Sequence, residues 1–257
     1  MIEREPSFRN RLASRERLLG TFLKTPTVHA TEILGGVGFD FVVIDAEHAP
    51  FGRTDIDVML LAARAARIAG LVRVPSDDPA HLLSVLDCGA TGVLVPHVTS
   101  AAMLERIVRA CRYDGGTRGF SNSPRAGRYG ALGIREHIEA ADANVTVLAM
   151  IEDAAAIDQI DAIFGIEGLD GAFIGRGDLA ASMGAASVIA PEIRDIVMRI
   201  AEAAKRHDVP LLAHVGSMAG EESDWLTAAG VTGFIVSSDQ GLMRSAALAQ
   251  CAALSAS

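Results

Sequence analysis

Two carboxylates and an imidazole follow directly after an apolar segment, at the place where a strand would end. They are Asp45, Glu47 and His48, and the run before them reads Phe-Val-Val-Ile. A continuous apolar run of this kind is typical of a parallel strand that is buried on both faces. Burying the three polar groups without partners would be strongly unfavourable. We therefore expect them on the loop after the strand, either exposed, paired or catalytically active.

Other expected strands also end on charged or imidazole side chains, namely Arg73, His97, Glu152 with Asp153, Arg176 with Asp178, and His214. In a closed barrel of parallel strands the carboxyl ends meet around one axis, so residues far apart in the sequence become neighbours. A single such residue would be ordinary strand-end polarity, either solvated or in a salt bridge. Six strands that all end in this way predict an active site.

Glu152 and Asp178 come from adjacent expected strands and form a plausible site for a hard cation. Oxygen ligands in pairs, with water or substrate completing the coordination, suit Mg²⁺ or Mn²⁺. Asp178 has an alternative role, since it precedes Leu-Ala-Ala and could be the N-cap of the next helix.

Arg73 follows a buried apolar pair and fits the recognition of a carboxylate or of a developing oxyanion. An internal ion pair with Asp45 or Glu47 is an equally good interpretation, and it does not exclude the first. His48 is a candidate metal ligand or general base, because an imidazole beside carboxylates suits proton transfer near neutral pH.

The order of apolar runs and helical patterns predicts an α/β fold, the (β/α)8 or TIM barrel. Strand-like runs lie at residues 20–24, 39–46, 70–75, 92–98, 145–152, 171–175, 209–214 and 233–237. Helical patterns separate most of them, at 55–69, 79–88, 100–111, 191–207 and 221–229, and Gly70, Gly89 and Gly230 are expected as left-handed caps. A doubly wound sheet is the second choice, but no GxGxxG motif follows the first strand. One domain spanning residues 1–257 is the simplest organisation.

Residues 113–133 form the longest irregular stretch, between the fourth and fifth expected strands. A long insertion in a compact domain is typical of a lid or binding loop. We expect this stretch on the side of the barrel that carries the active site.

Charge and cysteine content restrict the kind of partner and the compartment. The net charge of −9 over 257 residues argues against a nucleic-acid surface, but not against small anionic substrates bound by one or two arginines. The three cysteines lack metal-binding spacing, and neither a secretory signal nor a membrane-spanning stretch is evident. We therefore expect a cytoplasmic protein with reduced cysteines that binds neither nucleic acid nor membranes.

Segments along most of the chain, roughly from residue 20 to residue 241, share one joint pattern. They are residues 38–50, 72–75, 89–96, Tyr113 with Arg118-Gly119, and then 151–152 and 168–175 with Asp178-Leu179. This pattern resembles the HpcH/HpaI aldolase family. The resemblance implies a (β/α)8 barrel and a class II aldolase that makes or cleaves 4-hydroxy-2-oxo acids. The partners it implies are a divalent metal (Mg²⁺, Mn²⁺ or Co²⁺), pyruvate as the enolate-forming substrate, and an aldehyde.

The resemblance also assigns roles to the candidate residues. Glu152 and Asp178 would bind the metal, which chelates pyruvate. Arg73 would stabilise the enolate oxygen, and His48 would act in proton transfer at the aldol hydroxyl through a water molecule.

Further residues are assigned to supporting roles by the same resemblance. Asp87 matches a position that reaches the histidine of a neighbouring subunit, and Arg118 is a substrate-binding candidate. The backbone N–H groups of Gly177 and Asp178 would hold the pyruvate carboxylate, whereas Asp45 and Glu47 would orient Arg73 and metal-bound water. The resemblance also implies the family's homohexamer, in which a C-terminal helix is exchanged between subunits. Residues 242–257 are too apolar for a lone surface helix, so we expect them to pack on their own barrel or on a neighbour's.

One position departs from the family pattern. Arg176 lies between two glycines, where the family usually has proline before the metal-binding aspartate. This arginine could recruit a second anionic group of the substrate, or it could point outward and pair with Glu167 or Asp170.

Other functions remain open from the sequence alone. A class I aldolase needs a Schiff-base lysine, and the chain has only Lys24 and Lys205, of which Lys24 is the sole candidate. A related lyase could act on an acyl-CoA or another anionic 2-oxo acid, and a phosphosugar enzyme could bind phosphate at the last two strand ends. A non-catalytic barrel that binds an acidic metabolite is the alternative from a different class.

Overall fold

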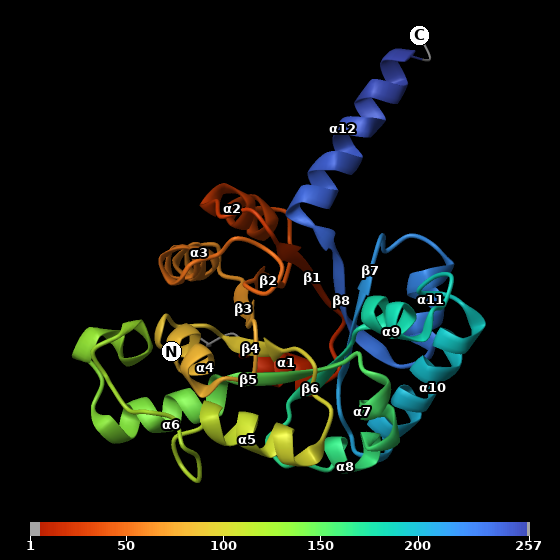
Figure 1. The fold of residues 1–257 in the computed structure, drawn as a ribbon. Coiled ribbons are helices and arrows are strands. Elements are labelled where there is room, and N and C mark those ends of the chain that lie inside the picture. Colours follow the sequence, from red (N-terminus) through yellow and green to blue (C-terminus); the bar gives the residue numbers. More distant parts are fainter. Residues whose placement is uncertain (1–5, 256–257) are drawn as a thin grey trace.

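The computed structural model describes residues 6–255, and its centre is a closed barrel of eight parallel strands (Figure 1). The strands follow one another around the barrel in chain order, and β8 pairs with β1 to close it. The predicted (β/α)8 fold is therefore confirmed. The strands are β1 (Leu18–Leu23), β2 (Phe41–Asp45), β3 (Ala69–Arg73), β4 (Gly92–Val95), β5 (Thr146–Ile151), β6 (Gly171–Ile174), β7 (Leu211–Val215) and β8 (Val231–Ser238).

The side chains of each strand alternate between the barrel interior and the layer under the helices. In β2, Phe41 and Val43 belong to the interior cluster, whereas Val42 and Ile44 pack into the outer core against the helices. The next interior position, at the carboxyl end of this strand, is Asp45.

The same alternation places polar residues of three other strands inside the barrel mouth. Leu71, Met150 and Leu212 are interior residues of β3, β5 and β7. Two positions further along each strand lie Arg73, Glu152 and His214. The period of two along the strands therefore directs these three side chains toward one region.

Helices surround the barrel and alternate with its strands (Figure 1). The helical segments are α1 (Phe8–Ala13), α2 (Val28–Gly36), α3 (Arg53–Ala65), α4 (Pro79–Asp87), α5 (Ala101–Cys111), η1 (Arg125–Gly130), α6 (Ile134–Asn144), α7 (Ala154–Asp158), α8 (Ile160–Phe164), α9 (Arg176–Met183), α10 (Pro191–Arg206), α11 (Glu221–Ala228) and α12 (Asp239–Ser255). Four of the five predicted helices agree with α4, α5, α10 and α11, whereas the helix predicted at 55–69 ends earlier, at Ala65.

Two of the three glycine caps are confirmed. Gly89 and Gly230 have φ angles of 89° and 95°, in the left-handed region that glycine adopts without strain. Gly70 is different, because it lies inside β3, and a Cβ there would lie only 2.8 Å from a methyl carbon of Leu60. This glycine allows α3 to pack closely against the strand.

Helix α1 was not predicted and closes the amino end of the barrel. Its Phe8 and Leu12 are buried in the interior cluster, and the Phe8 ring lies 5.2 Å from that of Phe41. The opposite end, where the strands terminate, remains open for the site.

The expected position of residues 113–133 is wrong. In a (β/α)8 barrel each helix runs from the carboxyl end of one strand back to the amino end of the next. The stretch begins where α5 ends, so it starts at the amino end of the barrel. Arg125 fastens it to the outside of the barrel, donating to the Cys88 carbonyl at 3.0 Å and pairing with Asp57 at 2.7 Å. It does not cover the mouth of its own barrel.

Helix α12 projects away from the barrel as a separate rod (Figure 1). It has no buried residue, and Met243 and Leu248 are 69% and 51% exposed. Within residues 6–255, no helix is both long and apolar enough to cross a membrane.

Candidate active site

A cavity of about 200 Å³ lies at the carboxyl ends of the strands. Its walls include Phe22, Arg73, Phe173, Gly175, Asp178 and His214. A larger hollow of about 660 Å³ lies at the amino end. We place the active site in the smaller cavity, because (β/α)8 enzymes form their sites at the carboxyl ends of the strands.

Asp45 and Arg73 form a buried, bidentate ion pair on one wall of this site. The Arg73 Nε and Nη2 groups donate to the two Asp45 carboxylate oxygens at 2.9 and 2.7 Å. The Lys24 ammonium contacts the same carboxylate at 2.6 Å. Burial alone would raise the pKa of Asp45, but the bonds from Arg73 and Lys24 outweigh it and lower the pKa to about 2. The predicted pair is confirmed, and Asp45 holds both cations in place.

Glu47 and His48 lie next to this pair, on the loop after β2. A Glu47 oxygen lies 3.3 Å from Arg73 Nε and 3.5 Å from His48 Nε2. The His48 backbone N–H donates to Asp45 at 3.1 Å, while its side chain is 57% exposed. The imidazole is therefore anchored through its backbone and free to reach a substrate.

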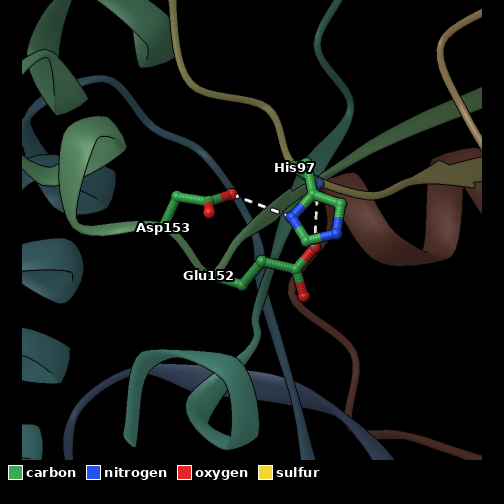
Figure 2. A group of neighbouring side chains, drawn as sticks. All are labelled: His97, Glu152 and Asp153. Carbon is green, nitrogen blue, oxygen red and sulfur yellow. Dashed lines mark hydrogen bonds and ion pairs between the residues drawn. The ribbon is translucent and has the colours of Figure 1, made fainter. Parts of the chain in front are cut away.

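Glu152 is almost fully buried and lies beside His97 and Asp153 (Figure 2). It accepts a hydrogen bond from the His97 backbone N–H at 2.8 Å, and His97 Nδ1 lies 3.0 Å from an Asp153 oxygen. One ligand atom from each of the three residues lies within 4.8 Å of the others. Carboxylate oxygens and an imidazole nitrogen at this spacing are suited to a divalent cation.

The charges around Glu152 favour a cation as well. Burial raises the pKa of Glu152 to about 7, and the negative charges of Asp178 and Glu47 act in the same direction, against the contacts with His97. The hydrogen bond with Asp153 raises the pKa of His97 in turn. A bound cation would neutralise this concentration of carboxylates.

Asp178 lies in the first turn of α9, close enough for its charge to act on Glu152. The N-cap of this helix is Gly175, so the alternative role of Asp178 as the cap is wrong. A Cβ on Gly175 would lie 2.4 Å from the Cβ of Glu152, which explains why glycine follows β6 at this point. Gly177 and Asp178 are both exposed toward the open end of the barrel.

Comparison with known proteins agrees with this geometry. The family model for HpcH/HpaI aldolase/citrate lyase matches residues 18–246. The chain belongs to this family. The 5-keto-4-deoxy-D-glucarate aldolase of Enterobacter sp. (strain 638) is 35% identical over 243 residues, which are 93% of each chain. The enzyme of the same name from Escherichia coli O6:H1 is 34% identical with the same coverage.

Solved structures of the family have the same fold. A HpcH/HpaI aldolase/citrate lyase family protein from Burkholderia cenocepacia J2315 superposes with a TM-score of 0.88 at 29% identity, covering 95% of this chain and 98% of the other. The citrate synthase SbnG has a TM-score of 0.85 at 30% identity, with 98% and 99% coverage. The protein is an aldolase, and therefore a lyase, in a family known for dependence on divalent metals.

In this aldolase, Arg176 points inward, so the alternative in which it points outward and pairs with Glu167 or Asp170 is wrong. The side chain is 4% exposed, and its guanidinium pairs with Glu222 at 2.8 Å and donates to the His214 carbonyl. Asp170 is paired with other arginines instead, Arg9 at 2.6 Å and Arg112 at 2.9 Å. Arg176 thus joins the start of α9 to β7 and α11.

Asp87 and Arg118 do not line the cavity at the carboxyl ends of the strands. Asp87 ends α4, and the chain direction places that end toward the amino end of the barrel. The two side chains lie 3.5 Å apart, and the Arg118 side chain is only 1% exposed. Its guanidinium stacks on the Tyr113 ring at 4.5 Å. Within one chain, this pair therefore lies apart from the cavity.

His97 is a candidate metal ligand that sequence reasoning missed. It was recognised as a strand-end residue, but no ligand role was assigned to it. Its backbone has a φ of 55°, an unusual conformation outside glycine that directs its N–H toward Glu152. The sequence signal that could have indicated His97 as a ligand is its position directly after Pro96, which follows β4.

Proposed function

We propose that this aldolase cleaves and forms 4-hydroxy-2-oxo acids, with pyruvate or a closely related 2-oxo acid as the enolate-forming partner and an aldehyde as the other. The observation that carries the proposal is a cavity lined by Arg73 and Asp178, with the buried Glu152 close enough to Asp178 for the two charges to interact. The relatives named for 5-keto-4-deoxy-D-glucarate support it, since that name describes an acid whose ketone is adjacent to a carboxylate.

We assign the divalent metal, either Mg²⁺, Mn²⁺ or Co²⁺, to Glu152 and Asp178, and His97 and Asp153 are further candidate ligands. The raised pKa of Glu152, due to burial and to the neighbouring carboxylates, supports a cation at this place. When bound, the metal supplies a Lewis acid that polarises the ketone of the 2-oxo acid.

Side chains and backbone groups of the protein stabilise the enolate, bind the substrate carboxylate and transfer the proton. Arg73, held rigid by Asp45, stabilises the negative charge that develops on the enolate oxygen. The backbone N–H groups of Gly177 and Asp178, at the start of α9, bind the substrate carboxylate. His48 transfers the proton at the aldol hydroxyl through a water molecule.

Exchange of the C3 protons of pyruvate in D₂O tests this proposal without knowledge of the aldehyde. We expect metal-dependent exchange by the purified enzyme, and a fall to the enzyme-free rate in EDTA that is reversed by added metal. Exchange that persists in EDTA, together with trapping of pyruvate on Lys24 by borohydride, would overturn the class II mechanism. The pairing of Lys24 with Asp45 argues against this outcome, because a paired ammonium is a poor nucleophile.

We also propose that the aldolase is a homo-oligomer, with a hexamer as the expected state, in which α12 packs on a second copy. An isolated helix with exposed Met243 and Leu248 is too apolar to remain in water. Near the start of α12, an apolar groove of about 490 Å³ is lined by Ile33, Val37 and other residues, and these two are 64% and 69% exposed. The free cysteines Cys88, Cys111 and Cys251 support a cytoplasmic location for this assembly.

A charge placed on the apolar side of α12 should disrupt this assembly. We expect Leu248→Glu to shift the enzyme to smaller species in size-exclusion chromatography with light scattering, because burial of the new carboxylate is unfavourable. Gln250→Glu, on an exposed polar position of the same helix, is the matched control and should keep the wild-type mass. A wild-type enzyme that is already a monomer would contradict the proposal.

A further inference from the structure

One wall of the cavity is formed by Phe22 and the side chains packed against it. Phe173 and His214 both contact the Phe22 ring, and His214 is the polar member of this group. Arg176 also borders the cavity, but its guanidinium is engaged by Glu222 and by the His214 carbonyl. The imidazole is therefore the group on this wall that is available to a substrate.

The strand pattern explains why His214 faces the cavity. In β7, Leu211 and Ala213 point to the outer core and Leu212 to the barrel interior, so His214 is the next interior position. It is the exposed residue of an otherwise buried strand. The exposed side chain lines the cavity.

His214 lies near the group assigned to the enolate oxygen. Its ring stacks on Phe22 with centroids 6.2 Å apart and planes 29° apart. The Arg73 guanidinium lies 4.7 Å from the centre of the same Phe22 ring. Phe22 thus contacts both residues, and a 2-oxo acid whose oxygens engage the metal and Arg73 presents its C3 carbon to the remaining wall.

The backbone around His214 is held in place by charged contacts. Arg176 binds its carbonyl and pairs with Glu222, and a Glu222 oxygen accepts from the Gly216 N–H at 3.4 Å. The ring also forms a hydrogen bond with the backbone of Ser237. A side chain fixed in this way is suited to recognise a substituent at a defined position.

We propose that His214 determines specificity by hydrogen-bonding a hydroxyl group on C3 of the 2-oxo acid, so that the aldolase prefers 2-oxo acids with a C3 hydroxyl over pyruvate. The inference rests on the proposed function and narrows its substrate class. A methyl group at this position would leave the open nitrogen of the imidazole without a partner from the substrate, which is unfavourable.

The neutral state of the His214 ring makes a hydroxyl group a better partner for it than a second carboxylate. Burial and the charge of Arg176 lower the pKa of His214, and Lys24 acts in the same direction, against Glu222 and the Ser237 backbone. The ring is therefore neutral at pH 7. Its N–H is engaged by the Ser237 backbone, so its other nitrogen is the acceptor that remains for a hydroxyl group.

Deuterium exchange at C3 of 3-hydroxypyruvate and of pyruvate, measured by mass spectrometry with Mg²⁺, Mn²⁺ or Co²⁺, tests the inference. For the wild type we expect kcat/KM to be at least about tenfold higher for 3-hydroxypyruvate, after subtraction of the enzyme-free rate. His214→Leu and His214→Phe should lower this ratio by about tenfold or more, because they remove the hydrogen bond. His214→Gln should retain most of it.

His207→Leu is the matched control, since this histidine pairs with Asp161 at the other end of the barrel and should leave the ratio unchanged. A wild type that prefers pyruvate, or apolar variants that keep the wild-type ratio, would overturn the inference while leaving the proposed function intact. If neither acid exchanges with any metal, the proposed function fails, and the inference fails with it. Melting temperatures of the two apolar variants identify any loss of fold.

Discussion

Glu152→Gln is expected to reduce metal-dependent exchange of the pyruvate C3 protons by about a thousandfold or more. The substitution keeps the size of the side chain and its acceptor for the His97 N–H, but removes the negative charge that we assign to the cation. A Lewis acid contributes several kcal/mol to stabilising an enolate, and each 1.36 kcal/mol is about tenfold in rate. The loss should therefore be in kcat, and excess metal should restore it only partly.

Substitution of two neighbouring aspartates distinguishes the two possible sets of metal ligands. Asp178→Asn should match the loss in Glu152→Gln if the metal lies between β5 and α9. Asp153→Asn should cause the greater loss if the metal lies in the cluster with His97, where Asp153 is 3.0 Å from the ring nitrogen. Titration of Mn²⁺ by calorimetry gives metal affinity independently of turnover. Full activity of Glu152→Gln in the presence of EDTA would contradict both metal sites.

The inward position of Asp45 and Arg73 was predictable from the sequence because it depends on the alternation of side chains along a strand. Buried apolar residues at every second position of β2 and β3 determine that Asp45 and Arg73 point into the barrel, and their pairing follows from charge. Period and polarity are local properties of the sequence, so they can be read without knowledge of distant contacts.

The features that were missed depend on contacts between distant segments. The inward position of Arg176 requires Glu222 on α11 and the carbonyl at the end of β7, neither of which has a local signature. The position of residues 113–133 was wrong because a loop after a helix was treated as a loop after a strand. Likewise, the contact between His97 and Glu152 depends on the left-handed backbone conformation of His97, which directs its N–H to Glu152.

Arg73→Lys is expected to lower kcat for enolate formation by about a hundredfold to a thousandfold, with a much smaller change in KM. Lysine keeps the positive charge but loses the planar group that donates two parallel bonds to Asp45. Removing one preorganised donor to an oxyanion has an effect of this size in other enzymes. A change confined to kcat indicates an interaction made in the transition state rather than in substrate binding.

Arg112→Lys is the matched control for this substitution. Arg112 is also buried and pairs with an aspartate, Asp170 at 2.9 Å, but it also bonds the backbone just before β5, at the amino end of the barrel. In both variants a buried ion pair loses its guanidinium, which can donate two parallel hydrogen bonds to a carboxylate. Both variants should therefore melt at a lower temperature than the wild type. Arg73→Lys alone should lose turnover at a temperature where both variants are folded. Equal kcat values in the two variants would mean that Arg73 is structural, and charge stabilisation at the enolate oxygen would then have to come from the metal site alone.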